Sequence, residues 1–198
     1  DSDDLTKYQG MPYGLPSAML SSNNDTSTLS FASKYIMTPT YGEVLMEYAE
    51  VEFILSEING WDATHYKTGV QASMDKWGVD ASKAAAYVSA LPVANQENVI
   101  TQKYLALYMQ GAEAWNEYRR TGFPNGGILL LPWQSAKDNN GATYTFTPLM
   151  SGNVVAKDLP ARVRYPITQP SLNGANYKEA SSRLSNGDEI DSKLFFAK

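Results

Sequence analysis

Apolar residues recur at helical spacing through the middle of the chain, from about residue 41 to residue 121. In the segment YGEVLMEYAEVEFILSEINGW, apolar side chains fall on neighbouring positions of one helical face, and acidic residues lie near the start. Gly60 ends this predicted helix. Asp62 is placed to cap a second helix that ends near Trp77, and we expect the two helices to form an antiparallel hairpin.

Two more helices are predicted after this pair. The third begins near Asp80 and ends at Leu91, because Pro92 follows. The fourth is predicted to run without a break from Gln96 to Thr121, and its apolar face consists of Tyr104, Leu107, Tyr108, Gly111, Ala112 and Trp115. Helices joined by short turns are typical of tetratricopeptide arrays, although no clean internal repeat is visible.

The end of the fourth helix indicates architecture rather than catalysis. Arg119 and Arg120 lie where cations favour a helix C-terminus, and Gly122 then stops the helix. We expect the two arginines to form internal ion pairs, with Glu50 as the partner. Trp77 and Trp115 belong to helix faces and are predicted to lie in the core.

The flanking regions have a different character, rich in Gly, Pro, Asn and aromatic residues. Residues 1–40 and 122–172 are predicted to be loop regions, and 173–198 a short helix over Asn173–Leu184 followed by an acidic tail. Short extended segments are expected at Ile128–Leu131, Thr143–Thr147 and Val163–Tyr165. The predicted fold is therefore mainly α-helical, with long irregular loops and at most short strands.

Composition narrows the range of functions. With 16 basic and 21 acidic residues the net charge is −5, which argues against nucleic acid as a partner. The chain has no cysteine, and His65 is its only histidine, so neither a cysteine nucleophile nor a zinc site of the usual spacing is available. We therefore predict no metal and no cofactor. The sequence contains no targeting signal and no apolar run long enough for a membrane-spanning helix.

No combination of residues singles out a catalytic site. His65 has no nucleophile in a glycine-rich elbow near it, so a Ser-His-Asp triad is rejected. Glu43, Glu47 and Glu50 could supply paired carboxylates for glycoside hydrolysis, but their spacing also suits a solvated helix face. We assign no catalytic residue and predict that the protein is not an enzyme.

Aromatic side chains in loops are the best candidates for ligand binding. Flat aromatic rings stack on the C–H faces of sugars but also pack into cores, so only aromatics outside the predicted helices are informative. Nearby amides that could bind sugar hydroxyls are Gln9, Gln134, Asn139 and Asn140. The predicted ligand-binding residues are Tyr8, Tyr13, Trp133, Tyr144 and Phe146.

Three ordered segments closely resemble the SusD/RagB family of outer-membrane nutrient-binding lipoproteins of the Bacteroidetes. They are YGEVLMEYAEVEFILSEINGW, VITQKYLALYMQGAEAWNEYRRTGFP and LPARVRYPITQPSLNGANYKEA, with ASMDKWGV between the first two. The resemblance covers most of the chain. It implies a mainly α-helical SusD-like fold with tetratricopeptide-type hairpins.

The resemblance also implies a function and a location. SusD-like proteins are lipid-anchored at the cell surface in the outer membrane, where they bind a glycan, less often a peptide, and deliver it to a SusC-like TonB-dependent transporter. Because family members are longer and begin with a lipidated cysteine, we expect residues 1–198 to be the C-terminal part of one SusD-like domain. Its partners would then include an N-terminal portion of the same protein, with the lipid anchor outside this chain.

Two other functions stay open. A tetratricopeptide-type scaffold would bind a peptide in a helical groove, and its ligand contacts would lie on helix faces rather than on the loops. A helical glycoside hydrolase would need two carboxyl groups facing each other across a groove. Alanine substitutions at Trp133 and Tyr144 would separate the scaffold from the glycan-binding protein.

Overall fold

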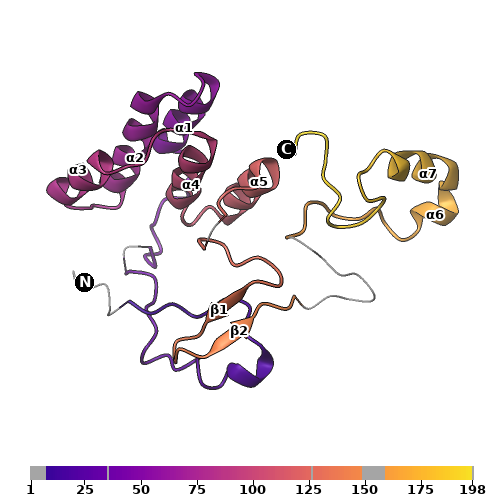
Figure 1. Cartoon of the computed structure of the whole chain (residues 1–198), viewed down its shortest axis with the longest axis horizontal. Coiled ribbons are helices and arrows are strands. Elements are labelled where there is room, and N and C mark those ends of the chain that lie inside the picture. Colours follow the sequence, from indigo (N-terminus) through magenta and orange to yellow (C-terminus); the bar gives the residue numbers. More distant parts are fainter. Residues whose placement is uncertain (1–7, 35, 126, 149–158, 198) are drawn as a thin grey trace. The chain divides into compact units, whose positions relative to one another are not determined.

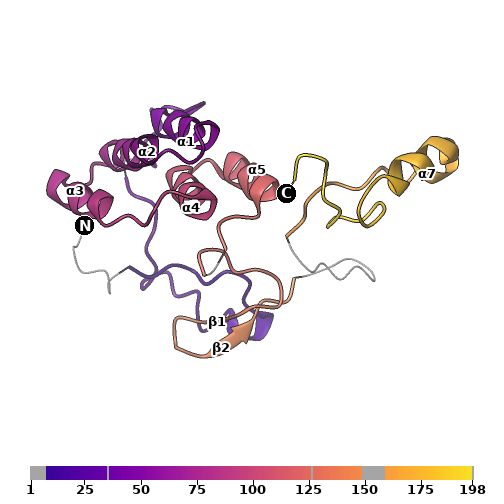
Figure 2. The same cartoon turned by 45° about the horizontal axis from the view of Figure 1, so that its top comes forward.

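The computed structural model describes residues 8–34, 36–125, 127–148 and 159–197. The chain divides into two units, which we describe separately. Residues 42–126 and 195–198 form a helical unit, and residues 1–41 and 127–194 form a loop unit. Most regular structure is helical, as predicted, and the ribbon is shown in two views (Figures 1 and 2). No helix within the described ranges combines the length and the hydropathy needed to cross a bilayer.

The helical unit consists of five consecutive helices. They are α1 (Tyr48–Ile58), α2 (Ala63–Lys76), α3 (Ala81–Ser89), α4 (Gln96–Ala106) and α5 (Gly111–Thr121). The predicted N-caps are confirmed, because the Asp62 carboxylate accepts from the backbone N–H groups of Thr64 and His65, each at 2.9 Å. Asp80 caps α3 in the same way. Gly122 closes α5 with a φ of 76°, a left-handed conformation that favours glycine.

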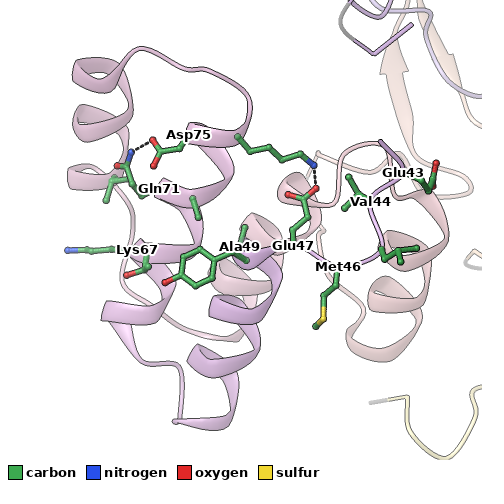
Figure 3. A pocket seen from close by; sticks show the side chains of 14 residues that line it. Glu43, Val44, Met46, Glu47, Ala49, Lys67, Gln71 and Asp75 are labelled. Atoms are coloured by element: carbon green, nitrogen blue, oxygen red, sulfur yellow. Dashed lines mark hydrogen bonds and ion pairs between the residues drawn. The ribbon is translucent and has the colours of Figure 1, made fainter. Parts of the chain in front are cut away.

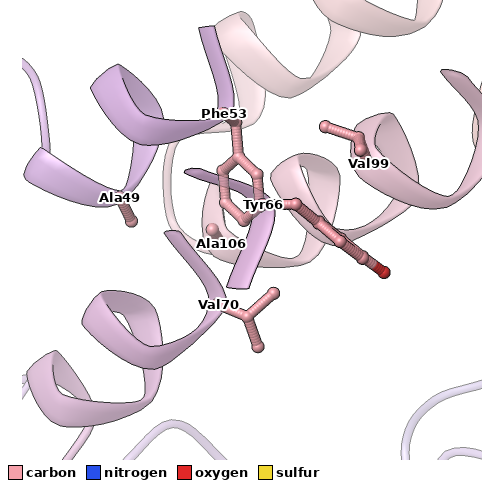
Figure 4. Packing of buried hydrophobic residues seen from close by; sticks show 6 residues of the cluster. All are labelled: Ala49, Phe53, Tyr66, Val70, Val99 and Ala106. Atoms are coloured by element: carbon pink, nitrogen blue, oxygen red, sulfur yellow. The ribbon is translucent and has the colours of Figure 1, made fainter. Parts of the chain in front are cut away.

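The core of the helical unit lies between α1, α2 and α4 (Figure 4). Its six buried residues are Ala49, Phe53, Tyr66, Val70, Val99 and Ala106. The hairpin of α1 and α2 is tight because Gly69 has no side chain, and a Cβ there would lie 3.0 Å from the Phe53 ring and 3.2 Å from the Ala49 carbonyl oxygen. Burial of the apolar faces of these helices provides the main stabilisation of the unit.

The predicted fourth helix is wrong in one respect, because the segment forms two helices. The chain turns between α4 and α5 at Met109, whose φ is 73°. The turn allows the Lys103 ammonium to contact the Glu117 carboxylate at 2.9 Å. In a straight helix these residues would be roughly 21 Å apart along the axis. Tertiary contacts therefore override the continuous apolar periodicity of this segment.

The ion pairs of the helical unit also correct the predicted partner of the arginines. Arg120 forms two parallel hydrogen bonds to Glu57, at 2.7 and 2.6 Å, and also contacts Glu117. Glu50, the predicted partner, is not the residue that Arg120 reaches. A guanidinium held by two carboxylates joins the end of α5 to the end of α1.

Two further expectations for the helical unit are wrong. The first helix begins at Tyr48 rather than near residue 41, because the Glu47 backbone is extended and its side chain forms an ion pair with Lys76. Trp115 is not in the core, since 39% of its surface is exposed and the Arg119 guanidinium lies 4.4 Å from the centre of its ring. A cation over an indole face stabilises this exposed arrangement.

The loop unit contains one antiparallel hairpin of β1 (Ser135–Lys137) and β2 (Thr143–Thr145), with Ala136 opposite Tyr144. This confirms the extended segment predicted at Thr143–Thr147, whereas Ile128–Leu131 and Val163–Tyr165 are not strands. A short 3₁₀ turn (η2, Ser17–Met19) precedes the hairpin.

The C-terminal part of the loop unit carries α6 (Gln169–Leu172) and α7 (Gly174–Ser182). The second of these confirms the short helix predicted over Asn173–Leu184. Arg162 is buried and donates to the Asp188 carboxylate at 2.6 Å. The Tyr177 hydroxyl donates to the same carboxylate at 3.3 Å, which connects α7 to the chain that follows it.

Candidate functional site

Two of the predicted ligand-binding aromatics lie exposed around a buried third one. Tyr13 and Trp133 are 62% and 48% exposed, whereas Phe146 is buried. The rings of Tyr13 and Phe146 meet edge to face with their centres 5.0 Å apart. The backbone N–H of Trp133 donates to the Phe146 carbonyl oxygen at 2.8 Å. We call these three residues the aromatic platform. Two large rings that face solvent, on residues that both contact Phe146, can stack on the faces of a ligand.

The backbone around the aromatic platform adopts uncommon conformations. Trp133 has a φ of 70°, in the left-handed region that non-glycine residues rarely occupy. Gly14 has a φ of 71° and lies so close to the Phe146 ring that a Cβ would overlap it. An exposed tryptophan held in a strained conformation is typical of a functional position.

Tyr144, the fourth predicted residue, lies beneath the aromatic platform. It is buried, and its hydroxyl donates to the Tyr13 carbonyl oxygen at 2.6 Å. Burial raises the pKa of Tyr144, so the hydroxyl keeps its proton at neutral pH. Tyr144 supports the exposed ring of Tyr13 rather than facing solvent. Tyr8, the fifth predicted residue, is 53% exposed and lies on the same opening loop as Tyr13.

A hydrogen-bonded network joins the opening loop, residues 8–34, to the β1–β2 hairpin. The Asn23 amide donates to the Asp138 carboxylate at 2.9 Å, and the Asn23 side-chain oxygen accepts from the Asn139 N–H at 3.0 Å. Asp138 also accepts from the N–H groups of Asn140 and Ala142, at 2.9 and 2.7 Å. The Asn23 amide and these N–H groups hold the pKa of the Asp138 carboxyl below its usual range.

Three of the amides predicted to bind sugar hydroxyls form internal hydrogen bonds instead. Asn139 donates to the Gly10 carbonyl at 3.1 Å and Asn140 to the Ser22 carbonyl at 3.0 Å. The Gln134 side-chain oxygen accepts from the Leu131 N–H at 3.0 Å. In this arrangement, these amides hold the loops that carry Tyr13 and Trp133. The sequence could not show this for Asn139 and Asn140, because their partners are more than 110 residues away in the chain.

The helical unit contains a groove that the sequence analysis missed (Figure 3). It has a volume of about 1030 Å³ and lies between residues 43–49 and one face of α2, with Val88 from α3. Val44, Met46 and Ala49 supply apolar surface, and Lys67 and Gln71 are among its polar residues. One signal was present in the sequence: the adjacent apolar residues Leu45 and Met46, which the structure leaves 90% and 59% exposed before α1 begins.

An ion pair and a side-chain hydrogen bond border this groove. Glu47 contacts Lys76 across it, and Gln71 donates to Asp75 at 2.8 Å along its α2 side (Figure 3). Nearby, the Tyr48 hydroxyl and the His65 ring hold the pKa of the Glu52 carboxyl below its usual range. The Nδ1 atom of His65 lies 2.7 Å from Glu52. Within the described ranges, no three histidine or acidic side chains are close enough to hold a metal ion.

The comparisons with known proteins place the chain in a class of outer-membrane-associated binding proteins. A family model, SusD-like_2, described as starch-binding and associating with the outer membrane, matches residues 1–147. The chain belongs to this SusD-like family. No curated protein sequence matches it at a significant level.

The solved structures that share the fold include the following two. One, described as Bacteroidetes AC2a SusD-like, is 26% identical with a TM-score of 0.57, over 78% of this chain and 30% of that one. The other, described as a chitin-binding protein, is 25% identical with a TM-score of 0.51, over 76% of this chain and 32% of that one. The chain thus matches about a third of the length of these structures. The predicted family and the mainly α-helical fold are confirmed.

Proposed function

We propose that the protein binds a glycan at the cell surface through the aromatic platform. The observation that carries this proposal is the exposure of Tyr13 and Trp133, both in contact with Phe146, in a chain of a family described as starch-binding. Sugar rings expose apolar C–H faces, and two solvent-facing aromatic rings offer complementary surface. Each ring that stacks on a sugar contributes favourable binding free energy, and the sugar needs no charge for this contact.

Family membership supports a proposed role in nutrient uptake. We propose that the bound glycan is delivered to a SusC-like TonB-dependent transporter, and that the protein itself does not cleave it. A lipid anchor outside this chain would hold the protein on the outer membrane. The family description supports the outer-membrane association, and the similarity to a chitin-binding protein supports a glycan ligand.

The experiment is a glycan screen followed by calorimetry, with maltoheptaose and chitohexaose as first probes. Trp133→Ala and Tyr13→Ala should each weaken binding roughly tenfold, as expected for the loss of one stacked ring. Trp115→Ala is the matched control, because Trp115 is a partly exposed tryptophan of the helical unit. Binding that survives both platform substitutions contradicts the proposed site, and released sugar fragments on chromatography contradict a purely binding role.

The groove beside α2 favours a second candidate function, the binding of a peptide on helix faces. Its apolar wall and polar rim are the features that tetratricopeptide-type grooves present to peptides. Met46→Lys places a charge on that wall, whereas Ile58→Lys places one at an exposed position of α1 that does not line the groove. Loss of peptide-library binding in the first variant alone would support this function.

A further inference from the structure

We propose that Tyr144 and Asn23 are positioning residues that hold the aromatic platform in its binding arrangement before any ligand arrives. This inference rests on the proposed function and deepens it. It assigns the affinity for glycan partly to two side chains that are themselves buried. Neither residue needs to touch the ligand.

Tyr13 is in a segment that regular secondary structure does not hold in place. The opening loop has only the short η2 turn after Tyr13, and residues 8–15 contain no helix or strand. The Tyr144 hydroxyl donates to the Tyr13 carbonyl oxygen at 2.6 Å, and Tyr144 is itself fixed in β2 opposite Ala136. This hydrogen bond therefore joins the ordered hairpin directly to Tyr13, the residue that carries an exposed ring.

Asn23 provides a second connection farther along the same loop. Its amide donates to Asp138 at 2.9 Å and also to the Met19 carbonyl oxygen at 2.9 Å, and its side-chain oxygen accepts from the Asn139 N–H at 3.0 Å. A single buried side chain thus uses both its donor and its acceptor groups to join the loop to the turn between β1 and β2. These contacts join residues that are more than 110 positions apart in the chain.

The other end of the aromatic platform is fixed by the hairpin itself. Two backbone hydrogen bonds hold it: the Trp133 N–H donates to the Phe146 carbonyl oxygen at 2.8 Å, and the Phe146 N–H donates to the Gln134 backbone carbonyl oxygen at 2.9 Å. Trp133 is therefore held whether or not the opening loop is docked. Tyr144 and Asn23 help to hold Tyr13 beside it, together with the Asn139 and Asn140 side chains that also bond to the opening loop. Preorganisation of both rings avoids the entropy cost of ordering the loop on binding.

Two conservative variants test the proposal by affinity, measured by calorimetry with maltoheptaose and chitohexaose on the whole chain. Tyr144→Phe removes one hydroxyl and keeps the ring, and we expect binding to weaken roughly three- to tenfold. Asn23→Ala removes the two hydrogen bonds of the Asn23 side chain to the hairpin turn, and we expect an equal or larger loss. Tyr177→Phe and Asn186→Ala are matched controls, because their side chains bond to Asp188 and Asp191 and not to the hairpin.

A direct measurement of geometry separates positioning from a general effect on stability. The chain has no cysteine, so Ser17→Cys and Lys137→Cys can carry two spin labels at exposed positions of the loop and of β1. Without ligand, the parent protein should give a narrow distance distribution by electron paramagnetic resonance. Tyr144→Phe and Asn23→Ala should broaden it, while the Tyr177→Phe and Asn186→Ala controls leave it unchanged.

The results distinguish failure of this inference from failure of the proposed function. If Tyr13→Ala and Trp133→Ala weaken glycan binding while Tyr144→Phe and Asn23→Ala leave both affinity and distance distribution unchanged, the positioning role is overturned and the binding site stands. If the parent protein binds neither probe, the glycan function fails for them. The distance distributions still decide whether the two residues position the loop.

Discussion

The helical unit and the loop unit are held together by different physical means. In the helical unit, the backbone polar groups are satisfied within each helix, so side chains are left to pack, and Phe53 and Tyr66 fill a buried apolar cluster. In the loop unit, few residues lie in regular structure, and side chains such as Asn23 and Asp138 provide partners for the loop backbone. We therefore expect the stability of the helical unit to depend most on the volume of its buried side chains, and that of the loop unit on its polar side-chain atoms.

The two units also display their aromatic residues differently. In the helical unit, the large rings at the centre are buried, and the partly exposed Trp115 has Arg119 over its face. In the loop unit, the buried rings of Phe146 and Tyr144 lie next to residues whose rings are exposed, Tyr13 and Trp133. A unit built on hydrogen bonds can present apolar surface to a ligand without losing its own core.

The largest expected effect tests the apolar core of the helical unit. Phe53→Ala removes a ring that is 1% exposed, and we expect it to lower the free energy of unfolding by about 3–5 kcal/mol. Urea denaturation followed by circular dichroism at 222 nm measures this change. Val51→Ala, at a more exposed position of the same helix, should change the free energy by less than about 0.5 kcal/mol. Equal effects of the two substitutions would contradict a core centred on Phe53.

The next effect concerns the buried ion pair between α4 and α5. Lys103→Met removes the cation next to Glu117, and both side chains are less than 10% exposed. Arg120 still contacts Glu117, so we expect a loss of about 2 kcal/mol in the free energy of unfolding rather than the larger cost of a wholly unpaired carboxylate. Lys67→Met, on the exposed face of α2, is the control. No difference between the two variants in urea denaturation would show that the pair does not hold α5 to α4.

A glycine substitution tests the loop unit by shape instead of charge. Gly14→Ala puts a methyl group against the Phe146 ring at a φ of 71°, and we expect a cost of about 1–3 kcal/mol together with weaker glycan binding. Gly10→Ala is the matched control, because a Cβ there meets nothing within 4 Å. Thermal melting followed by near-ultraviolet circular dichroism, which reports on the packed aromatics, measures the difference. A silent Gly14→Ala would show that Tyr13 and Phe146 are not packed as described.

The smallest effect is a pH dependence of the contact between the opening loop and the β1–β2 hairpin. The folded state holds the pKa of Asp138 below its usual range, so the carboxylate contributes stability above the unfolded-state pKa of about 3.9 and loses it as the pH falls through the lower folded value. We expect the spin-label distance distribution between the loop and β1 to broaden below about pH 4. In Asp138→Asn this transition should disappear. Asp25→Asn, which alters only a local turn, should keep it.

Most of the helical unit could be predicted from the sequence because its signals are local. Asp62, Asp80 and Gly122 mark helix ends through hydrogen bonds and backbone conformations that involve only neighbouring residues. The break at Met109 could not be predicted, since the apolar pattern continues across it and the contact that requires it joins residues 14 positions apart. The partner of Arg120 was missed for the same reason.

The candidate site was only half predictable. Composition and loop position selected Tyr13, Trp133, Tyr144 and Phe146, and the structure places all four together in one region. Their division into exposed and supporting residues depends on the loop–hairpin contacts, which the sequence does not reveal. Whether these residues bind a glycan stays a prediction.

The sequence by itself determined the family, the mainly helical character, the helix caps and the absence of cysteine chemistry, because each depends on residue type and short-range spacing. Only the tertiary structure decided which aromatic rings face solvent, which amides are used internally, and where the groove beside α2 lies. The physical reason is that burial and hydrogen-bond partnership are properties of pairs of residues, and the pairs that matter here, such as Asn23 with Asp138, are brought together by folding over long chain separations.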